Sequence, residues 1–180
     1  MIRVRWLGRG GQGSFTASRL LGKAASIFEG KYALAFPSFG PERRGAPVLA
    51  FTRIDDKKIT DRSEIPEYEF LVVMDDTLLD ENAVRGLTAG GYIIINRSSK
   101  EDLKPFLDDF KVISIDATSL ALEILGLPIT NTAMLGALVA ASGMVSLESV
   151  LKSIEDEMKP DLVEKNKKIV QKAYTMIRGN

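Results

Sequence analysis

At residues 2–13 the chain reads IRVRWLGRGGQG, an extended apolar run that leads directly into a glycine-rich turn. An amphipathic helix is expected from about Ser14, so the turn connects a strand to a helix. Its spacing matches G-x-G-x-x-G, which in this context forms loops that hold phosphate groups. Glycine lets the backbone approach an anion, and the helix N-terminus offers unpaired N–H groups. The alternative is a tight strand-to-helix connection that needs glycine for steric reasons alone.

The composition excludes several kinds of catalytic site. The 180 residues include no cysteine and no histidine. This excludes disulfides, thiolate metal sites, iron–sulfur ligation by cysteine, and catalysis by a cysteine nucleophile or a histidine base. The 24 basic and 24 acidic residues give a formal net charge of zero, which does not favour binding to nucleic acid or to an anionic membrane. A chain of this length is expected to form a single domain, residues 1–180.

One uncharged stretch is long enough to be considered as a membrane span. Residues 124–147 carry no charge over 24 residues. Pro128, Thr130 and Asn131 interrupt the stretch and leave an apolar helical segment too short to cross a bilayer. We therefore expect a buried core helix. Because the N-terminal residues show no signal-peptide pattern, we expect a soluble, cytoplasmic protein without membrane contact.

Strand and helix patterns alternate along the chain, which is typical of a layered α/β fold. The apolar runs predict strands at 2–7, 32–36, 48–54, 70–74, 92–95 and 112–115. The helical spacing predicts helices at 14–29, 77–86, 117–125, 132–142, 147–158 and 161–178. We expect a Rossmann-like, doubly wound and mostly parallel sheet with helices on both faces and a helical C-terminal end.

Standard dinucleotide binding requires a second signal that this chain lacks. An acidic residue about 20 residues after the glycines, at the end of the second strand, usually binds the ribose hydroxyls. Here that strand ends in Phe36-Pro37-Ser38, and Glu29, at about the right count, ends the first helix instead. NAD binding is therefore disfavoured.

The loop after the second expected strand is unusual. Residues 37–47 read PSFGPERRGAP, with two adjacent arginines, Arg43 and Arg44. Its prolines restrict the backbone, its arginines supply guanidinium donors, and it exceeds the usual length of about two to six residues. In a parallel sheet it leaves the same carboxyl edge as the glycine turn, where ligands of open α/β sheets bind. We interpret it as a binding or docking loop; the alternative is a solvated surface turn.

Two further polar positions are explained most simply by local structure. Asp75 and Asp76 follow the strand at 70–74, and successive strand side chains point to opposite faces, so these two do not form a catalytic pair. Asp76 is expected to cap the following helix, and Asn131 the apolar helix at 132–142. The small residues of that helix suit burial in the core, or equally against another subunit.

Three motifs, in order along almost the whole chain, resemble one known family. They are GRGGQG at 8–13, SFGPERRGAP at 38–47 and NTAMLGA at 131–137. Together they are similar to the gamma subunits of the 2-oxoacid:ferredoxin oxidoreductases, and the pyruvate version fits best. Ser14 and Phe15 depart from the small aliphatic residues typical after the glycines, which affects the packing of the loop. The candidate cofactor-binding residues in these motifs are Gly8, Gly10, Gly11, Gln12, Gly13, Ser38, Arg43, Arg44, Asn131 and Thr132.

The resemblance implies a non-catalytic subunit of an enzyme. Such complexes oxidatively decarboxylate pyruvate with coenzyme A, giving acetyl-CoA and carbon dioxide, and pass the electrons to ferredoxin. Thiamine diphosphate, Mg²⁺ and [4Fe-4S] clusters do this chemistry on partner chains. The implied partners are alpha and beta chains that share the thiamine cofactor and a ferredoxin-like delta chain. The missing cysteines agree with this division, and the chain alone is expected to bind no cofactor and to catalyse no reaction.

The contribution of this chain to such a complex is open between several roles. We hypothesise that the amides of Gly10, Gly11 and Gly13 and the guanidinium groups of Arg43 and Arg44 hold coenzyme A or shape its approach to the thiamine cofactor. In the competing account the arginines dock on the alpha chain, or the chain serves assembly only. Further alternatives are a gamma subunit for branched-chain 2-oxoacids, 2-oxoglutarate or indolepyruvate, and a free-standing nucleotide-binding oxidoreductase.

Overall fold

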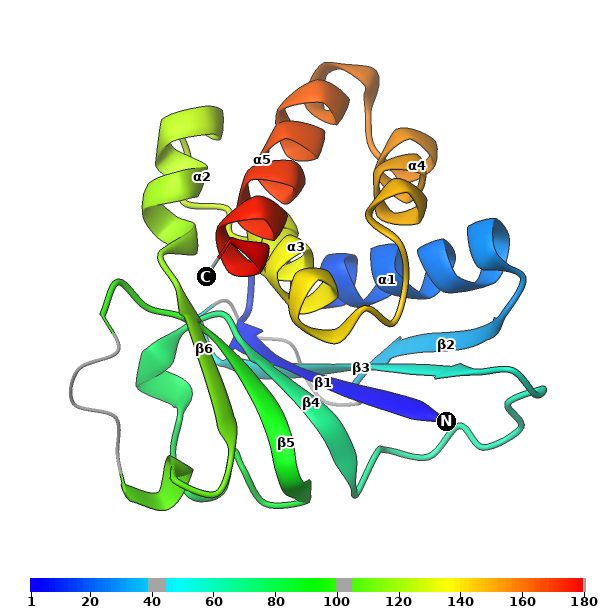
Figure 1. Ribbon diagram of the computed structural model, residues 1–180, viewed down its shortest axis with the longest axis vertical. Helices are drawn as coiled ribbons and strands as arrows, with labels where there is room; N and C mark the ends of the chain where they lie inside the picture. Colours follow the sequence, from blue (N-terminus) through cyan, green and yellow to red (C-terminus); the bar gives the residue numbers. More distant parts are fainter. Residues whose placement is uncertain (39–44, 100–104, 180) are drawn as a thin grey trace.

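A mixed six-stranded sheet forms the centre of the protein (Figure 1). The computed structural model describes residues 1–38, 45–99 and 105–179. The strands are β1 (Ile2–Arg9), β2 (Tyr32–Pro37), β3 (Pro47–Asp55), β4 (Tyr68–Val73), β5 (Leu87–Asn96) and β6 (Lys111–Ile115). They lie in the order β2-β3-β1-β4-β5-β6. Each strand predicted from an apolar run is present, which confirms the α/β class.

The strand directions place five carboxyl ends at one edge of the sheet. β1, β4, β5 and β6 are parallel neighbours, whereas β3 runs antiparallel to both β1 and β2. β3 differs because only nine residues separate it from β2, fewer than the dozen or so that a crossover to a parallel strand needs. β3 therefore starts where the other strands end, and Pro47 lies opposite Arg9.

The α-helices lie on one face of the sheet (Figure 1). They are α1 (Ser14–Glu29), α2 (Ala117–Leu125), α3 (Asn131–Ser142), α4 (Leu147–Glu157) and α5 (Pro160–Arg178). In the described part of the chain, two 3₁₀ helices and connecting loops cover the opposite face. These are η1 (Asp76–Leu78) and η2 (Pro105–Leu107). We expected helices on both faces of the sheet. In the described residues, the face opposite the α-helices carries 3₁₀ helices only.

The prediction of a helix at 77–86 is wrong, because only a single 3₁₀ turn, η1, forms at its start. η1 ends at Leu78, and the chain then continues in turns. Aspartate side chains compete for the backbone amides here: Asp75 accepts the amide of Thr77 at 3.1 Å, and Asp80 accepts the amide of Ala83 at 2.8 Å. Such local hydrogen bonds replace the helical pattern with short turns.

The centres of strands β4 and β5 are buried on both faces, as their continuous apolar runs predict. In β1, Val4 and Trp6 pack with the α-helices, whereas Leu7 joins the cluster on the opposite face. In β5, Ile94 packs on the helical side and its neighbour Ile93 on the other. The alternation places the side chains of one apolar strand in two separate hydrophobic clusters.

α3 is the central helix of the helical layer, and its residues from Asn131 to Ala140 are all buried. A Cβ added at Gly136 would lie 2.6 Å from the carbonyl oxygen of Val170, so α3 and α5 approach each other closely. The apolar helical part of the uncharged stretch, α3, is therefore a core helix, as expected, and its burial is explained within this chain. None of the helices in the described residues is long and apolar enough to cross a membrane. The cytoplasmic location stays a prediction.

The arginines of β1 are held by the neighbouring parallel strand. Because Arg3 and Arg5 alternate with apolar residues, the sequence leaves two possibilities: the side chains extend along the sheet to solvent, which we expected, or they meet carboxylates on another element or subunit. For Arg3 the second holds, since its Nη2 lies 2.5 Å from Oε1 of Glu69 on β4. The Arg5 guanidinium lies over the ring of Tyr68, 5.2 Å from its centroid. Partners on another strand decide both positions, and the sequence of β1 alone does not reveal them.

Candidate functional site

The glycine loop after β1 and the end of the proline-rich loop lie side by side at the carboxyl edge of the sheet. The Gly10 amide donates to the carbonyl oxygen of Ala46 at 2.8 Å, and the Gly45 amide donates to that of Gly10 at 3.3 Å. This proximity agrees with the expectation that both motifs meet at one edge. Arg43 and Arg44 lie outside the described residues.

The glycine loop needs glycine at three positions for identifiable reasons. Gly11 and Gly13 have φ values of 94° and 82°, in the left-handed region that favours glycine. A Cβ at Gly8 would lie 2.5 Å from Oγ of Ser14. The Gln12 side chain folds back and accepts the amide of Arg9 at 2.6 Å. The loop is thus closed by its own hydrogen bonds, and the Gly10 amide is already engaged.

α1 begins directly after this loop, and its N-terminus has no side-chain cap and no acidic residue in its first turn. Its first intrahelical bond runs from the amide of Ala17 to the carbonyl oxygen of Gly13 at 3.0 Å. The amides of residues 14–16 therefore precede the helical ladder. A cleft of about 340 Å³ lies in front of them, lined among others by Arg9, Gly11, Gly13 and Thr16.

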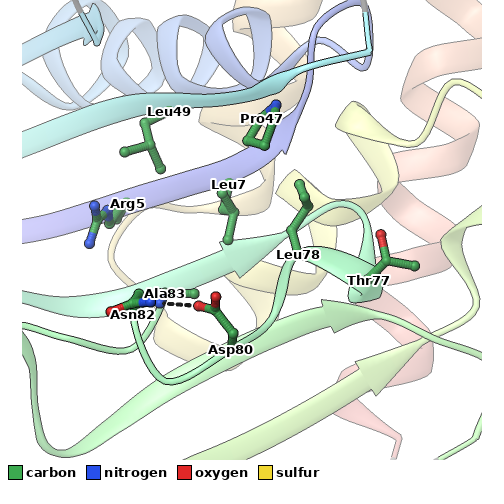
Figure 2. A pocket seen from close by; sticks show the side chains of 9 residues that line it. All are labelled: Arg5, Leu7, Pro47, Leu49, Thr77, Leu78, Asp80, Asn82 and Ala83. Atoms are coloured by element: carbon green, nitrogen blue, oxygen red, sulfur yellow. Dashed lines mark hydrogen bonds between the residues drawn. The ribbon is translucent and has the colours of Figure 1, made fainter.

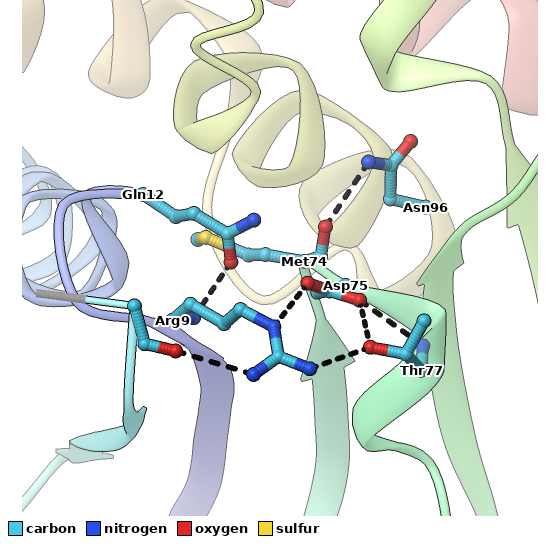
Figure 3. A network of polar contacts seen from close by, with 7 residues as sticks. Arg9, Gln12, Met74, Asp75, Thr77 and Asn96 are labelled. Carbon is cyan, nitrogen blue, oxygen red and sulfur yellow. Dashed lines mark hydrogen bonds and ion pairs between the residues drawn. The ribbon is translucent and has the colours of Figure 1, made fainter.

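Arg9 joins three segments of the carboxyl edge, as Figure 3 shows. Its Nε donates to Asp75 Oδ2 at 2.7 Å, its Nη2 to Thr77 Oγ1 at 2.8 Å, and its Nη1 to the carbonyl oxygen of Gly45 at 3.2 Å. It thereby ties the glycine loop to the end of the proline-rich loop and to η1. Asp75, rather than the expected Asp76, caps η1. Sequence reasoning missed Arg9, although an arginine and an aspartate at the ends of two parallel strands were visible.

The carboxylate of Asp75 is ionised in this network. Burial raises the pKa of Asp75, but hydrogen bonds from Thr77 and Arg9 outweigh it, and the pKa lies below its ordinary value. A carboxylate that stays ionised and bonded to a guanidinium is unsuited to proton transfer near neutral pH. Asn96 adds a second cross-link at this edge, since its Nδ2 donates to the carbonyl oxygen of Met74 at 3.0 Å. The network therefore positions loops.

Asn131 is brought to the glycine loop, whereas Thr132 faces away from it. A Cβ at Gly13 would lie 2.5 Å from Nδ2 of Asn131. Thr132 is fully buried, and its hydroxyl donates to Oδ1 of Asn166 in α5 at 2.8 Å. The expected cap at Asn131 is wrong: the N-cap position is Thr130, and Asn131 is the first helical residue.

Ser38 stands at the start of the proline-rich loop, directly after β2. Its amide donates to the carbonyl oxygen of Leu49 at 2.9 Å, and its hydroxyl donates to Oε1 of Glu64 at 2.6 Å. Both groups are thus bonded within the protein. These bonds fix the point at which the chain leaves the sheet.

A second cleft, of about 380 Å³, contains no residue of the predicted site (Figure 2). Its walls include Arg5 and Leu7 of β1, Leu49 of β3 and Asp80 after η1. Leu7 belongs to the hydrophobic cluster on the face away from the α-helices. Thr77 lines this cleft and also accepts a hydrogen bond from Arg9, so the cleft adjoins the Arg9 network.

Comparison with known proteins decides the family. The family model of pyruvate ferredoxin/flavodoxin oxidoreductase matches residues 3–176. The chain belongs to this family. It is 53% identical over 175 residues to the pyruvate synthase subunit PorC of Methanocaldococcus jannaschii, with 97% of this chain and 96% of the relative covered.

A second relative agrees in length, and a solved structure agrees in fold. The pyruvate/ketoisovalerate oxidoreductases common subunit gamma of Thermococcus litoralis is 49% identical over 178 residues, with 97% of this chain and 96% of that protein covered. The crystal structure of the pyruvate oxidoreductase subunit PORC from Thermotoga maritima is similar with a TM-score of 0.83 and 37% identity, over 96% of this chain and 94% of that one. In this member of the pyruvate ferredoxin/flavodoxin oxidoreductase family, Arg9 holds the glycine loop, Gly45 and η1 together at the carboxyl edge of the sheet.

Proposed function

We propose that this chain is the gamma subunit of a pyruvate:ferredoxin oxidoreductase. The complex converts pyruvate, coenzyme A and oxidised ferredoxin to acetyl-CoA, carbon dioxide and reduced ferredoxin. The observation that carries this proposal is the similarity, over nearly the full length of both chains, to a protein named as a pyruvate synthase subunit.

The residues of this chain support a non-catalytic role within the complex. The chain has neither histidine nor cysteine, and the carboxylate nearest the glycine loop is bonded to Arg9. As the resemblance to this family implies, the proposal assigns thiamine diphosphate, Mg²⁺ and [4Fe-4S] clusters to the alpha, beta and delta chains, and the absence of cysteine here agrees with this for the clusters. When bound there, they supply the decarboxylation and the electron transfer.

The contribution that we assign to this chain is to shape the coenzyme A site. The uncapped start of α1 and the cleft in front of it suit a phosphate group, because amides at a helix N-terminus attract anions. With the Gly10 amide engaged by Ala46, the backbone donors left for this role are those of Gly11, Gly13 and the first turn. Arg43 and Arg44 belong to the same proposal on the strength of the sequence.

The test is a reconstituted complex of the four co-expressed chains, assayed anaerobically for pyruvate-dependent ferredoxin reduction. Omission of this chain is expected to abolish activity. In the intact complex, Arg43→Glu combined with Arg44→Glu is expected to raise the KM for coenzyme A at least about tenfold, which corresponds to the loss of about one charge-assisted hydrogen bond. An unchanged KM in an intact complex would refute the coenzyme A role. Loss of assembly would assign the arginines to docking.

A second candidate, a subunit shared between two oxidoreductases, is favoured by one observation. The Thermococcus litoralis relative is named as common to pyruvate and ketoisovalerate enzymes. Purification of the tagged chain from its own source distinguishes the two. A single set of catalytic chains supports a dedicated subunit, whereas two sets, one of them active on 2-oxoisovalerate, support a shared one.

A further inference from the structure

An apolar groove of about 310 Å³ lies in the helical layer, away from the sheet. Its walls come from the end of α2 and the connection to α3 (Leu125 and Leu127), from Met158 between α4 and α5, and from Leu162 in α5. Figure 1 shows α2 beside α5 on this side of the molecule, and the two helices are in contact. The groove is thus built by segments that are distant in the sequence.

Large aliphatic side chains are exposed along this groove. Leu127 is 55% exposed, Leu162 43% and Ile129 42%. They come from two different elements, yet all three line the same groove. Clustered exposed aliphatic side chains mark an interaction surface more often than a free one.

The polar groups that line the groove are largely engaged within the protein. Asn166 accepts the hydroxyl of Thr132 through Oδ1 and donates Nδ2 to the carbonyl oxygen of Leu162, both at 2.8 Å. The Oδ1 atom of Asn131 accepts the Thr132 amide at 2.9 Å. A polar small molecule would find few partners here. The lining fits an apolar occupant.

Lys165 is the one charged side chain among the residues that line the groove. It forms no ion pair with a carboxylate in residues 1–38, 45–99 or 105–179. A carboxylate on the occupant would form an ion pair with Lys165. A second copy of this chain does not fit, because a two-fold interface presents the same patch on both sides, and no residue that lines the groove offers a carboxylate to Lys165.

We infer that this groove docks a different chain of the oxidoreductase, through a segment whose apolar ridge is flanked by a carboxylate. The inference rests on the proposed function, which supplies the partner chains. Thr16 and Asn131 connect the groove to the glycine loop: Thr16 also lines the cleft at the start of α1, and Asn131 contacts Gly13. The docked chain would therefore lie next to the glycine loop and complete the site there.

The test compares replacement of exposed aliphatic residues by aspartate inside and outside the groove, in complexes of the four co-expressed chains. Leu127→Asp combined with Ile129→Asp places carboxylates on the groove and is expected to weaken association at least about 100-fold, the effect of losing two anchor residues. Ile27→Asp on α1 is the control, since Ile27 is 66% exposed and lies outside the groove. It is expected to leave association unchanged. Circular dichroism of each purified chain checks the fold.

Affinity purification through a tag on this chain, followed by analytical ultracentrifugation, reads out assembly. Co-purification of the alpha, beta and delta chains with wild type and Ile27→Asp but not with the groove variant supports the inference. Equal recovery with the groove variant, or equal loss with the control, overturns it while the proposed function stands. If the wild-type chain recovers none of the three, the proposed function itself fails. Self-association of the wild-type chain that the groove variant abolishes would assign the groove to a second copy and overturn the inference as well.

Discussion

Replacing Gly13 with alanine tests the contact between the glycine loop and α3. At φ 82° an alanine costs about 1–2 kcal/mol relative to glycine. Its Cβ would also lie 2.5 Å from Nδ2 and 3.2 Å from Cβ of Asn131, and Asn131 is itself buried. Overpacking of this kind costs about 1–3 kcal/mol. The free energy of unfolding is therefore expected to fall by about 2–5 kcal/mol.

Gly11→Ala provides the matched control. Gly11 has a similar φ of 94°, but nothing lies within 4 Å of an added Cβ. Only the backbone cost of about 1–2 kcal/mol applies, and the effect of alanine on the unfolded chain is the same for both variants. The difference between the two variants thus isolates the contact with Asn131.

Urea denaturation of the two purified chains, followed by circular dichroism, measures this difference. We expect Gly13→Ala to be less stable than Gly11→Ala by about 1–3 kcal/mol. For a chain of this length the gap corresponds to several degrees in Tm, at about 2–4 °C per kcal/mol. Adding Asn131→Ala to Gly13→Ala is expected to recover part of the loss. Equal stability of the two glycine variants would refute the proposed contact.

Three further predictions, two of them with a control variant, test the Arg9 network and the core. Because the folded pKa of Asp75 is lowered, the stability that it supplies is present above the ordinary value of about 3.9 and is lost as pH falls through the folded pKa. Asp75→Asn should therefore flatten the acid side of the stability–pH curve, and an unchanged slope would contradict the Arg9 network. Gly136→Ala places a Cβ 2.6 Å from a backbone oxygen of α5 and should cost about 1–3 kcal/mol. Gly22→Ala, whose Cβ has its nearest neighbour at 3.4 Å, should be neutral or stabilising by up to about 1 kcal/mol in the same urea denaturation assay. Thr52→Val removes the acceptor 3.0 Å from the indole nitrogen of Trp6 and should cost about 1–3 kcal/mol. Thr52→Ser should not, and the fluorescence of the single tryptophan reports both; equal midpoints would count against the bond.

β4 and β5 could be predicted from the sequence because their centres are buried on both faces, and continuous apolar runs are the direct consequence of such burial. The start of α1 was also visible from the glycine turn, and helical spacing located α5 to within one residue, since the helix begins at Pro160 instead of the expected Asp161. The direction of β3 could not be read from its own residues. It follows from the length of the connection to β2 and from pairing with β1.

The location of the candidate site could be predicted from the sequence, but the hydrogen bonds that connect its residues could not. The glycine loop and Gly45 meet at the expected edge, because strand ends define that edge. Arg9 and Asp75 are separated by 66 residues, and their pairing depends on β1 and β4 being neighbours. That adjacency has no local signal in the chain. A shift of one residue in the end of β4 likewise decides that Asp75 caps η1.

The most direct test of the central claim is anaerobic affinity purification of the tagged chain from its own source, with native mass and visible absorbance recorded. We predict a brown complex several times heavier than the 19.7 kDa of this chain, which contains three further chains and reduces ferredoxin with pyruvate and coenzyme A. A colourless particle that contains this chain alone would contradict the account.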